Sequence, residues 1–115
     1  LHREAFENGI LDQCQKWGIR PTAWSPLGGG ILLSPSEDSN ISKVQTIIAE
    51  LGEKHNAQPD QVLLAWLRKH PAAIVPVLGS SQLSRIKNAT DSLKIKLTHE
   101  EWYMLWQAAT GTEIA

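Results

Sequence analysis

Residues 21–30 read PTAWSPLGGG, a short apolar run that ends in a Ser-Pro turn and three glycines. A strand that stops at such a turn exposes backbone N–H groups with no side chains in the way, so the turn can wrap an anion or a flat cofactor. Three glycines after a strand also form plain flexible loops, and more often than they form binding sites. This stretch therefore predicts a strand and a turn, and a binding site needs a second, independent observation.

The second observation is residues 73–81, AIVPVLGSS, where another β-branched run ends in glycine and two serines, with Arg85 and Asn88 following. If a helix begins near Ser81, then Ser81 and Arg85 lie at i and i+4 and point the same way. The helix N-terminus would add its dipole and free N–H groups, as phosphate sites use. Alternatively, Ser81 only caps the helix and Arg85 is a solvated charge. This stretch alone supports both interpretations equally.

Composition limits the classes of partner. A chain of 115 residues fits one domain, over residues 1–115, and its 42% hydrophobic and 20% charged residues are ordinary for a globular protein. The net charge of -1 provides no basic face for nucleic acid or anionic lipid, and no segment approaches the length of a membrane span. A single cysteine, Cys14, excludes an internal disulfide and a multi-cysteine metal site. We therefore expect a cytoplasmic protein that binds neither nucleic acid nor a membrane.

Periodicity and turn residues predict alternating helices and strands. The expected elements are a helix from residue 10 that stops at Gly18, a strand over 20–24, a helix over 42–56, a helix from 59 that ends before Pro71, a strand over 73–77, a helix over 81–93 and a tail helix after Thr98. Two capping boxes are predicted, Ser42 with Gln45 and Thr98 with Glu101. Strands separated by helices are expected to be parallel, and ligands bind beyond the carboxyl ends of parallel strands. Both glycine turns fall at such ends, so together they predict one site.

The chain resembles the aldo-keto reductases over essentially its whole length, and within them the bacterial branch of general oxidoreductases. The most specific parts are residues 23–30, AWSPLGGG, and residues 76–81, PVLGSS, together with Arg85 and Asn88. The family's fold is a TIM barrel. The resemblance implies that these segments are the seventh and eighth strands, with flanking and tail helices and the loops that hold NADPH.

The resemblance also implies roles in the first turn. Trp24 occupies the place of an aromatic residue that stacks on the nicotinamide. The pyrophosphate is implied to lie against the loop, held mainly by backbone N–H groups of Ser25, Leu27, Gly28 and Gly29.

In the second turn, Ser80, Ser81 and Arg85 are implied to hold the adenosine 2'-phosphate, and Asn88 to lie beside the adenine. Gly79 belongs to the same predicted site, although some branches of the family place a lysine there. The implied cofactor is NADPH, and glycine in place of that lysine leaves the preference for NADPH over NADH open.

The catalytic residues of the family have no counterpart in this chain. Adding hydride to a carbonyl leaves charge on oxygen, which a tyrosine proton must quench, with support from lysine, aspartate and histidine. The one tyrosine, Tyr103, lies on the expected tail helix, and we interpret it as a packing residue. No pair of histidines has metal-ligand spacing, so no metal site is predicted. Asp60 and Asp91 are interpreted as helix-start and surface residues.

A complete barrel takes roughly 250 residues. We therefore expect the C-terminal, cofactor-binding part of an NADPH-dependent oxidoreductase that acts on small aldehydes and ketones. A fragment of this kind has exposed strand edges and is expected to self-associate. The alternative is a free-standing, non-catalytic module that binds a nucleotide or phosphate through the same two loops.

Overall fold

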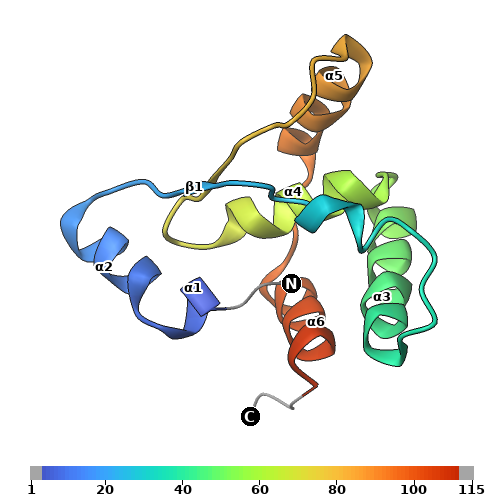
Figure 1. The fold of residues 1–115 in the computed structure, drawn as a ribbon, viewed down its shortest axis with the longest axis horizontal. Helices are drawn as coiled ribbons and strands as arrows, with labels where there is room; N and C mark the ends of the chain where they lie inside the picture. Colours follow the sequence, from blue (N-terminus) through green and yellow to red (C-terminus); the bar gives the residue numbers. More distant parts are fainter. Residues whose placement is uncertain (1–3, 112–115) are drawn as a thin grey trace.

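The computed structural model describes residues 4–111 as helices arranged around one pair of parallel strands, an α/β architecture (Figure 1). The α-helices, in chain order, are α1 (Glu4–Glu7), α2 (Ile10–Trp17), α3 (Ser39–His55), α4 (Pro59–Lys69), α5 (Leu83–Asp91) and α6 (His99–Thr110). The strands are β1 (Thr22–Ala23) and β2 (Val75–Pro76), and the 3-10 turns are η1 (Gly28–Gly30) and η2 (Ser92–Lys94). Within this described part of the chain, no helix is both long and apolar enough to cross a membrane.

The two strands pair in parallel, with Thr22 beside Val75 and Ala23 beside Pro76. The predicted parallel pairing, across two intervening helices, is therefore confirmed. Each strand has only two paired residues, fewer than the five expected.

The strands are short because the backbone leaves the extended conformation on both sides of the pairing. Ser25, after β1, has φ 48°, and Ala73, before β2, has φ 54°. Both angles lie in the left-handed region, which does not continue a strand. Pro76 also has no N–H to donate to a ladder.

Helix α4 lies at the centre of the core. Its residues 61–67 are all buried, and α3 and α6 pack beside it. Trp66 is 1% exposed, and its ring stacks on that of Trp102 in α6, with centroids 4.7 Å apart. Each indole Nε1–H donates to the other residue's backbone carbonyl, over 3.0 Å in both cases. The pair therefore joins α4 to α6 by stacking and by two hydrogen bonds.

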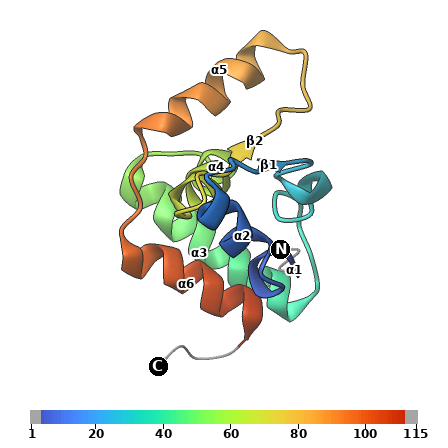
Figure 2. The same cartoon turned by 90° about the vertical axis from the view of Figure 1, so that its left-hand side faces the viewer.

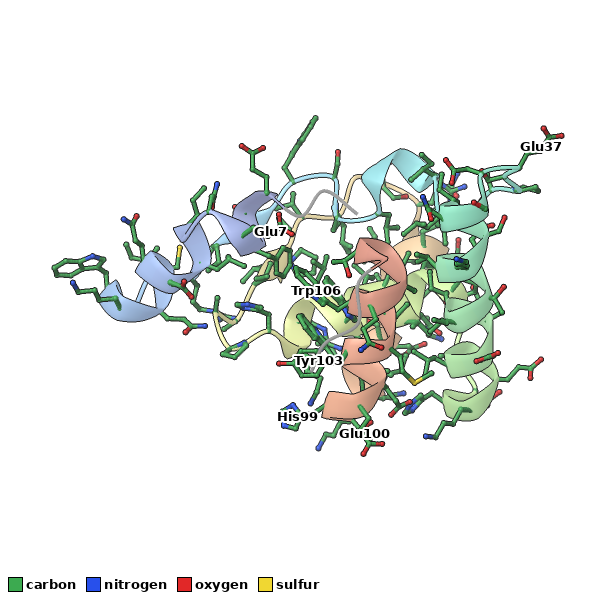
Figure 3. The ribbon with its side chains drawn as sticks, turned by 90° about the horizontal axis from the view of Figure 1, so that it is seen from below. Glu7, Glu37, His99, Glu100, Tyr103 and Trp106 are labelled. Atoms are coloured by element: carbon green, nitrogen blue, oxygen red, sulfur yellow. The ribbon has the colours of Figure 1, made fainter. Side chains whose placement is uncertain are left out.

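Helix α6 presents the predicted apolar face to this core. Leu105 is buried. Trp106, labelled in Figure 3, packs on the core, and its ring stacks on that of Trp66 with centroids 6.4 Å apart. Tyr103 is 47% exposed, and its ring lies edge-on to that of Trp102, with ring centroids 5.1 Å apart. Its ring thus packs on the helix surface more than in the core.

The ends of two helices confirm their sequence predictions. Gly18 closes α2 with φ 65°, and its N–H donates to the last turn of the helix. At the start of α6, the N–H of Glu101 donates to Thr98 Oγ1 over 3.1 Å, and the N–H of Thr98 donates to Glu101 Oε1 over 2.9 Å. This reciprocal pair is the predicted capping box.

The same Glu101 carboxylate joins α6 to the end of α3. It lies 2.7 Å from His55 Nε2 and 3.7 Å from Lys54 Nζ. Burial raises the pKa of the Glu101 carboxyl, but the hydrogen bonds from Thr98 and His55 together outweigh burial and hold this pKa below its ordinary value.

The predicted Ser42–Gln45 capping box is wrong. Helix α3 begins at Ser39, because Asp38 is its N-cap and accepts the first free N–H groups of the helix. Ser42 and Gln45 therefore lie inside α3. Both side chains reach back to the preceding loop, where Ser42 Oγ donates to Ser36 O over 3.1 Å.

The predicted start of the helix after β2 is also wrong. Helix α5 begins at Leu83 with Gln82 as its N-cap, so Ser81 lies outside it and the expected i, i+4 pair with Arg85 does not form. No residue of α5 is buried, and Leu93, expected to face inward, is 61% exposed. Figure 2 shows α5 at one end of the molecule and α6 at the other. The apolar core thus lies away from α5.

Candidate functional site

One groove of about 770 Å³ lies where the two glycine turns meet, bordered by the start of α4 and one side of α5. The predicted site residues that line it are Ser25, Leu27, Gly29, Gly79, Ser80, Arg85 and Asn88. The groove falls within the range of about 300–1,000 Å³ that is usual for small-molecule sites. Two turns that are far apart in the sequence therefore share one cavity, because the parallel pairing places both at the same end of the sheet.

The first turn has a backbone that requires glycine. Gly28, Gly29 and Gly30 have φ of 57°, 70° and 84°, and a side chain is strained in this region. Ser25 adopts φ 48° without being glycine, and such strain is common at ligand sites. The turn is stabilised internally, because Gly28 N–H donates to Ser25 O over 2.8 Å and Gly30 N–H donates to Leu27 O over 2.9 Å.

The second turn contributes hydroxyl, backbone and guanidinium groups to the groove. Ser80 is partly buried and its Oγ accepts the N–H of Gln82 over 3.1 Å. Arg85 is exposed, and within residues 4–111 its guanidinium has no hydrogen-bond or ion-pair partner. Nothing lies within 4 Å of a Cβ built on Gly79, so the turn is open at that residue. Arg85 is therefore a cation that a bound anion could pair with.

Three of the predicted residues do not line the groove. Trp24 is 86% exposed. The N–H of Gly28 donates to a carbonyl within the turn, and Ser81 is exposed and precedes α5. A pyrophosphate would have to share or displace the Gly28 hydrogen bond. Arg85 and Gly29 therefore line the same groove, whereas Trp24 is not among its lining residues.

Asp60 is a groove residue that the sequence did not identify. It lies in the first turn of α4, and its Oδ2 accepts a hydrogen bond from Asn88 Nδ2 over 2.6 Å. The neighbouring Gln61 donates from Nε2 to the backbone carbonyl of Asn88 over 2.9 Å. Because these contacts span 27 and 28 residues, no local sequence pattern could have indicated them.

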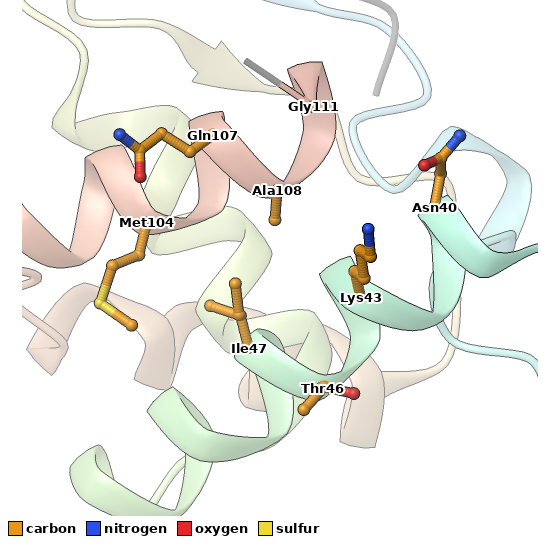
Figure 4. Close-up of a pocket in the computed structure, with 8 residues that line it drawn as sticks. All are labelled: Asn40, Lys43, Thr46, Ile47, Met104, Gln107, Ala108 and Gly111. Atoms are coloured by element: carbon orange, nitrogen blue, oxygen red, sulfur yellow. The ribbon is translucent and has the colours of Figure 1, made fainter. Parts of the chain in front are cut away.

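A second groove, of about 540 Å³, lies between α3 and α6 (Figure 4). Its lining residues are Asn40, Lys43, Thr46, Ile47, Met104, Gln107, Ala108 and Gly111. None of the predicted site residues is among them, so this groove is separate from the two glycine turns.

Comparison with known proteins gives a family. The sequence model of the Aldo/keto reductase family matches residues 1–109. The 6-dehydroglucose reductase of Agrobacterium fabrum is 39% identical over 115 residues, which is 100% of this chain and 37% of that protein. The 6-dehydroglucose reductase of Novosphingobium aromaticivorans is 37% identical over 114 residues, which is 99% of this chain and 37% of that protein.

The fold has a solved relative as well. A thermostable aldo-keto reductase, crystallised with the inhibitor epalrestat, superposes with a TM-score of 0.77 and 28% identity, over 92% of this chain and 35% of that one. The chain spans 37% of the length of the two 6-dehydroglucose reductases named above. With the family profile, the sequence relatives and the solved fold in agreement, the chain belongs to the aldo/keto reductase family.

Proposed function

We propose that this chain is the C-terminal, cofactor-binding part of a TIM-barrel oxidoreductase that uses NADPH to reduce aldehydes and ketones. The observation that carries the proposal is the groove that both glycine turns and the exposed Arg85 line. Membership in the aldo/keto reductase family supports the same cofactor.

We assign the groove residues to successive parts of NADPH. The strained turn at Ser25 and Gly29 would accept the pyrophosphate, Ser80 and Arg85 the 2'-phosphate, and Asn88 the adenine. Trp24 directly precedes the lining residue Ser25, and its exposed indole is the flat surface proposed for the nicotinamide. When bound, NADPH supplies the hydride. The residues of this chain bind and orient the cofactor.

The substrate class follows from the relatives. Both reductases with the identities given above are named for 6-dehydroglucose, so we propose oxidised sugars among the carbonyl compounds to assay first. We further propose that the tyrosine, lysine, aspartate and histidine that handle the proton lie outside residues 1–115, because the chain spans 37% of these relatives.

Replacing Arg85 by Ala in the protein that contains this chain tests the proposal. Losing a hydrogen-bonded charge costs about 1.5–3 kcal/mol, so the Kd for NADPH should rise about 10- to 150-fold, while the Kd for NADH stays nearly unchanged. Titration calorimetry at one fixed salt concentration measures both constants. Lys87→Ala is the matched control, because Lys87 is an exposed cation of α5 that does not line the groove. An equal loss for both cofactors would remove Arg85 from the 2'-phosphate site.

A further inference from the structure

The dipeptide of Asn8 and Gly9 links α1 to α2 (Figure 1). Asn8 is exposed, and its Oδ1 accepts the backbone N–H of Ile10 over 3.1 Å. This Asx turn folds the side chain back over the peptide that follows, so the amide carbon Cγ is held on the side of the Gly9 nitrogen. The side chain is therefore oriented toward a backbone atom with which it can react.

The backbone nitrogen of Gly9 is available as a nucleophile. Within residues 4–111, its N–H donates to no acceptor in the protein. Gly9 has no side chain, and nothing lies within 4 Å of the position that a Cβ would take, so the approach to the nitrogen is open. The N–H of Ile10 also stabilises the negative charge that develops on Asn8 Oδ1 during an attack on Cγ, as donors at oxyanion sites do.

The other three asparagines, Asn40, Asn56 and Asn88, precede backbone nitrogens that are already engaged. The N–H after Asn40 donates to Asp38 Oδ1 over 3.3 Å, and the N–H after Asn56 donates to the carbonyl of Gly52 over 2.8 Å. Asn88 lies inside α5, where the following N–H belongs to the hydrogen bonds of the helix. Each of these nitrogens would have to give up a hydrogen bond before it could attack. Of the four asparagines, Asn8 alone precedes a free nitrogen.

We propose that Asn8 is a site of spontaneous covalent modification, at which the asparagine is converted into aspartate and isoaspartate. The Gly9 nitrogen forms a bond to Asn8 Cγ, the bond from Cγ to Nδ2 breaks, and Nδ2 leaves as ammonia with the proton of the Gly9 N–H. One water molecule then opens the five-membered succinimide. Opening at Cγ gives aspartate, whereas opening at the backbone carbonyl carbon gives isoaspartate, in which the main chain runs through the former side chain.

The two products have different consequences for packing. Isoaspartate adds one methylene to the backbone between two helices that are both anchored in the interior. The ring centroid of Phe6 in α1 lies 5.4 Å from that of Trp66, and Leu11 in α2 is 6% exposed. The longer link changes the spacing of Phe6 and Leu11 and so weakens the fold. Aspartate keeps the backbone length, and its carboxylate still accepts the N–H of Ile10 at the end of α2 where negative charge is favoured.

The experiment incubates the protein that contains this chain, folded or unfolded in guanidinium chloride, and analyses it by tryptic digestion and mass spectrometry. Cleavage after lysine and arginine places the four asparagines in separate peptides, which are residues 4–16, 17–43, 55–68 and 88–94. In the folded protein, conversion of the amide to the acid should be fastest in residues 4–16 and should accelerate as the pH rises, because the attacking nitrogen must lose its proton. An isoaspartate-specific carboxyl methyltransferase detects the isoaspartate product. Asn8→Gln is the control variant, since its longer side chain would have to close a six-membered ring, and it should show no product in this peptide.

Comparing the folded with the unfolded protein tests the structural argument apart from the sequence. A hydrogen bond that must be broken slows attack by about two- to twelvefold, so unfolding should accelerate conversion at the other three asparagines by at least about twofold. It should not accelerate conversion at Asn8, whose following nitrogen is free in the folded protein. A rise at Asn8 as large as that at Asn40 would overturn the proposal, as would an Asn8 that stays unmodified while Asn40 or Asn56 converts.

Thermal unfolding tests the consequence for packing. The fraction that carries isoaspartate, separated by ion-exchange chromatography, should have a lower Tm than Asn8→Asp, whereas Asn8→Asp should keep the Tm of the unmodified protein. Equal Tm values for the isoaspartate fraction and Asn8→Asp would show that the length of the link does not matter for packing. None of these measurements involves the cofactor groove, so this proposal stands or fails independently of the proposed function.

Discussion

Replacing Trp66 by Phe should destabilise the fold through a defined set of losses. The indole is 1% exposed, stacks on Trp102 at 4.7 Å, and donates from Nε1 to the Trp102 carbonyl over 3.0 Å. Phenylalanine keeps an aromatic ring but removes the donor and part of the buried surface. The reciprocal hydrogen bond, from Trp102 Nε1 to the Trp66 carbonyl, ends on the backbone and therefore survives the substitution.

The size of the effect follows from these contacts. One lost hydrogen bond costs about 1 kcal/mol, and the missing ring atoms correspond to about two buried methylene groups at about 0.8 kcal/mol each. The free energy of unfolding should fall by about 2 to 3 kcal/mol. For a chain of 115 residues, each kcal/mol lowers Tm by about 4 °C, so Tm should fall by about 8 to 12 °C.

Far-ultraviolet circular dichroism is the appropriate assay, because tryptophan fluorescence changes with the substitution itself. Urea and thermal unfolding of the wild type and the variant measure the difference. Trp17→Phe is the matched control, since Trp17 is 69% exposed and its replacement should change stability by no more than about 0.5 kcal/mol. If Trp66→Phe were as mild as this control, the stacked pair would not be the centre of the core.

Two further predictions concern backbone packing and pH. Gly52→Ala should lower the free energy of unfolding by about 1 to 2 kcal/mol, because the new Cβ would lie 2.8 Å from the carbonyl oxygen of Ala57. Gly79→Ala is the control, since nothing lies within 4 Å of a Cβ at that position, and urea unfolding should show no change in stability. Burial lowers the pKa of His70, whose Nδ1 accepts the N–H of Ala72 over 3.1 Å, so the unfolded chain binds the proton more readily. The contribution of His70 to the free energy of unfolding should therefore be full above pH 6.5 and be lost as the pH falls below it. His70→Asn keeps a hydrogen-bond acceptor, so its urea-unfolding stability should depend less on pH between pH 7 and 5.

Several features of this chain follow from residues that are close in the sequence. The end of α2 at Gly18 and the Thr98–Glu101 capping box depend on groups within four residues of each other, and both predictions are confirmed. The strand before each glycine turn was also predicted, and only its length was overestimated. These features could be predicted because the groups that form them are neighbours in the sequence.

The local predictions that failed did so where a stronger neighbour competed. Ser42 is a good N-cap residue, but Asp38 caps the same helix earlier, because the loop before it turns to bring its carboxylate to the first free N–H groups. Ser81 was expected to begin α5, but the helix starts at Leu83, and Ser80 uses its hydroxyl to accept the N–H of Gln82. In both places, local propensity did not identify the residue at which the helix begins.

The glycine turns, the serines and Arg85 could be identified as candidate ligand groups from residue types alone, since turn chemistry and charge are local properties. That they line one groove depends on the parallel pairing of β1 with β2. The contact of Asp60 with Asn88 depends on how α4 packs against α5. The two residues are 28 positions apart, so no helical or strand periodicity in the sequence relates them. The residue types therefore indicate the candidate groups, and long-range packing decides which of them lie together in the groove.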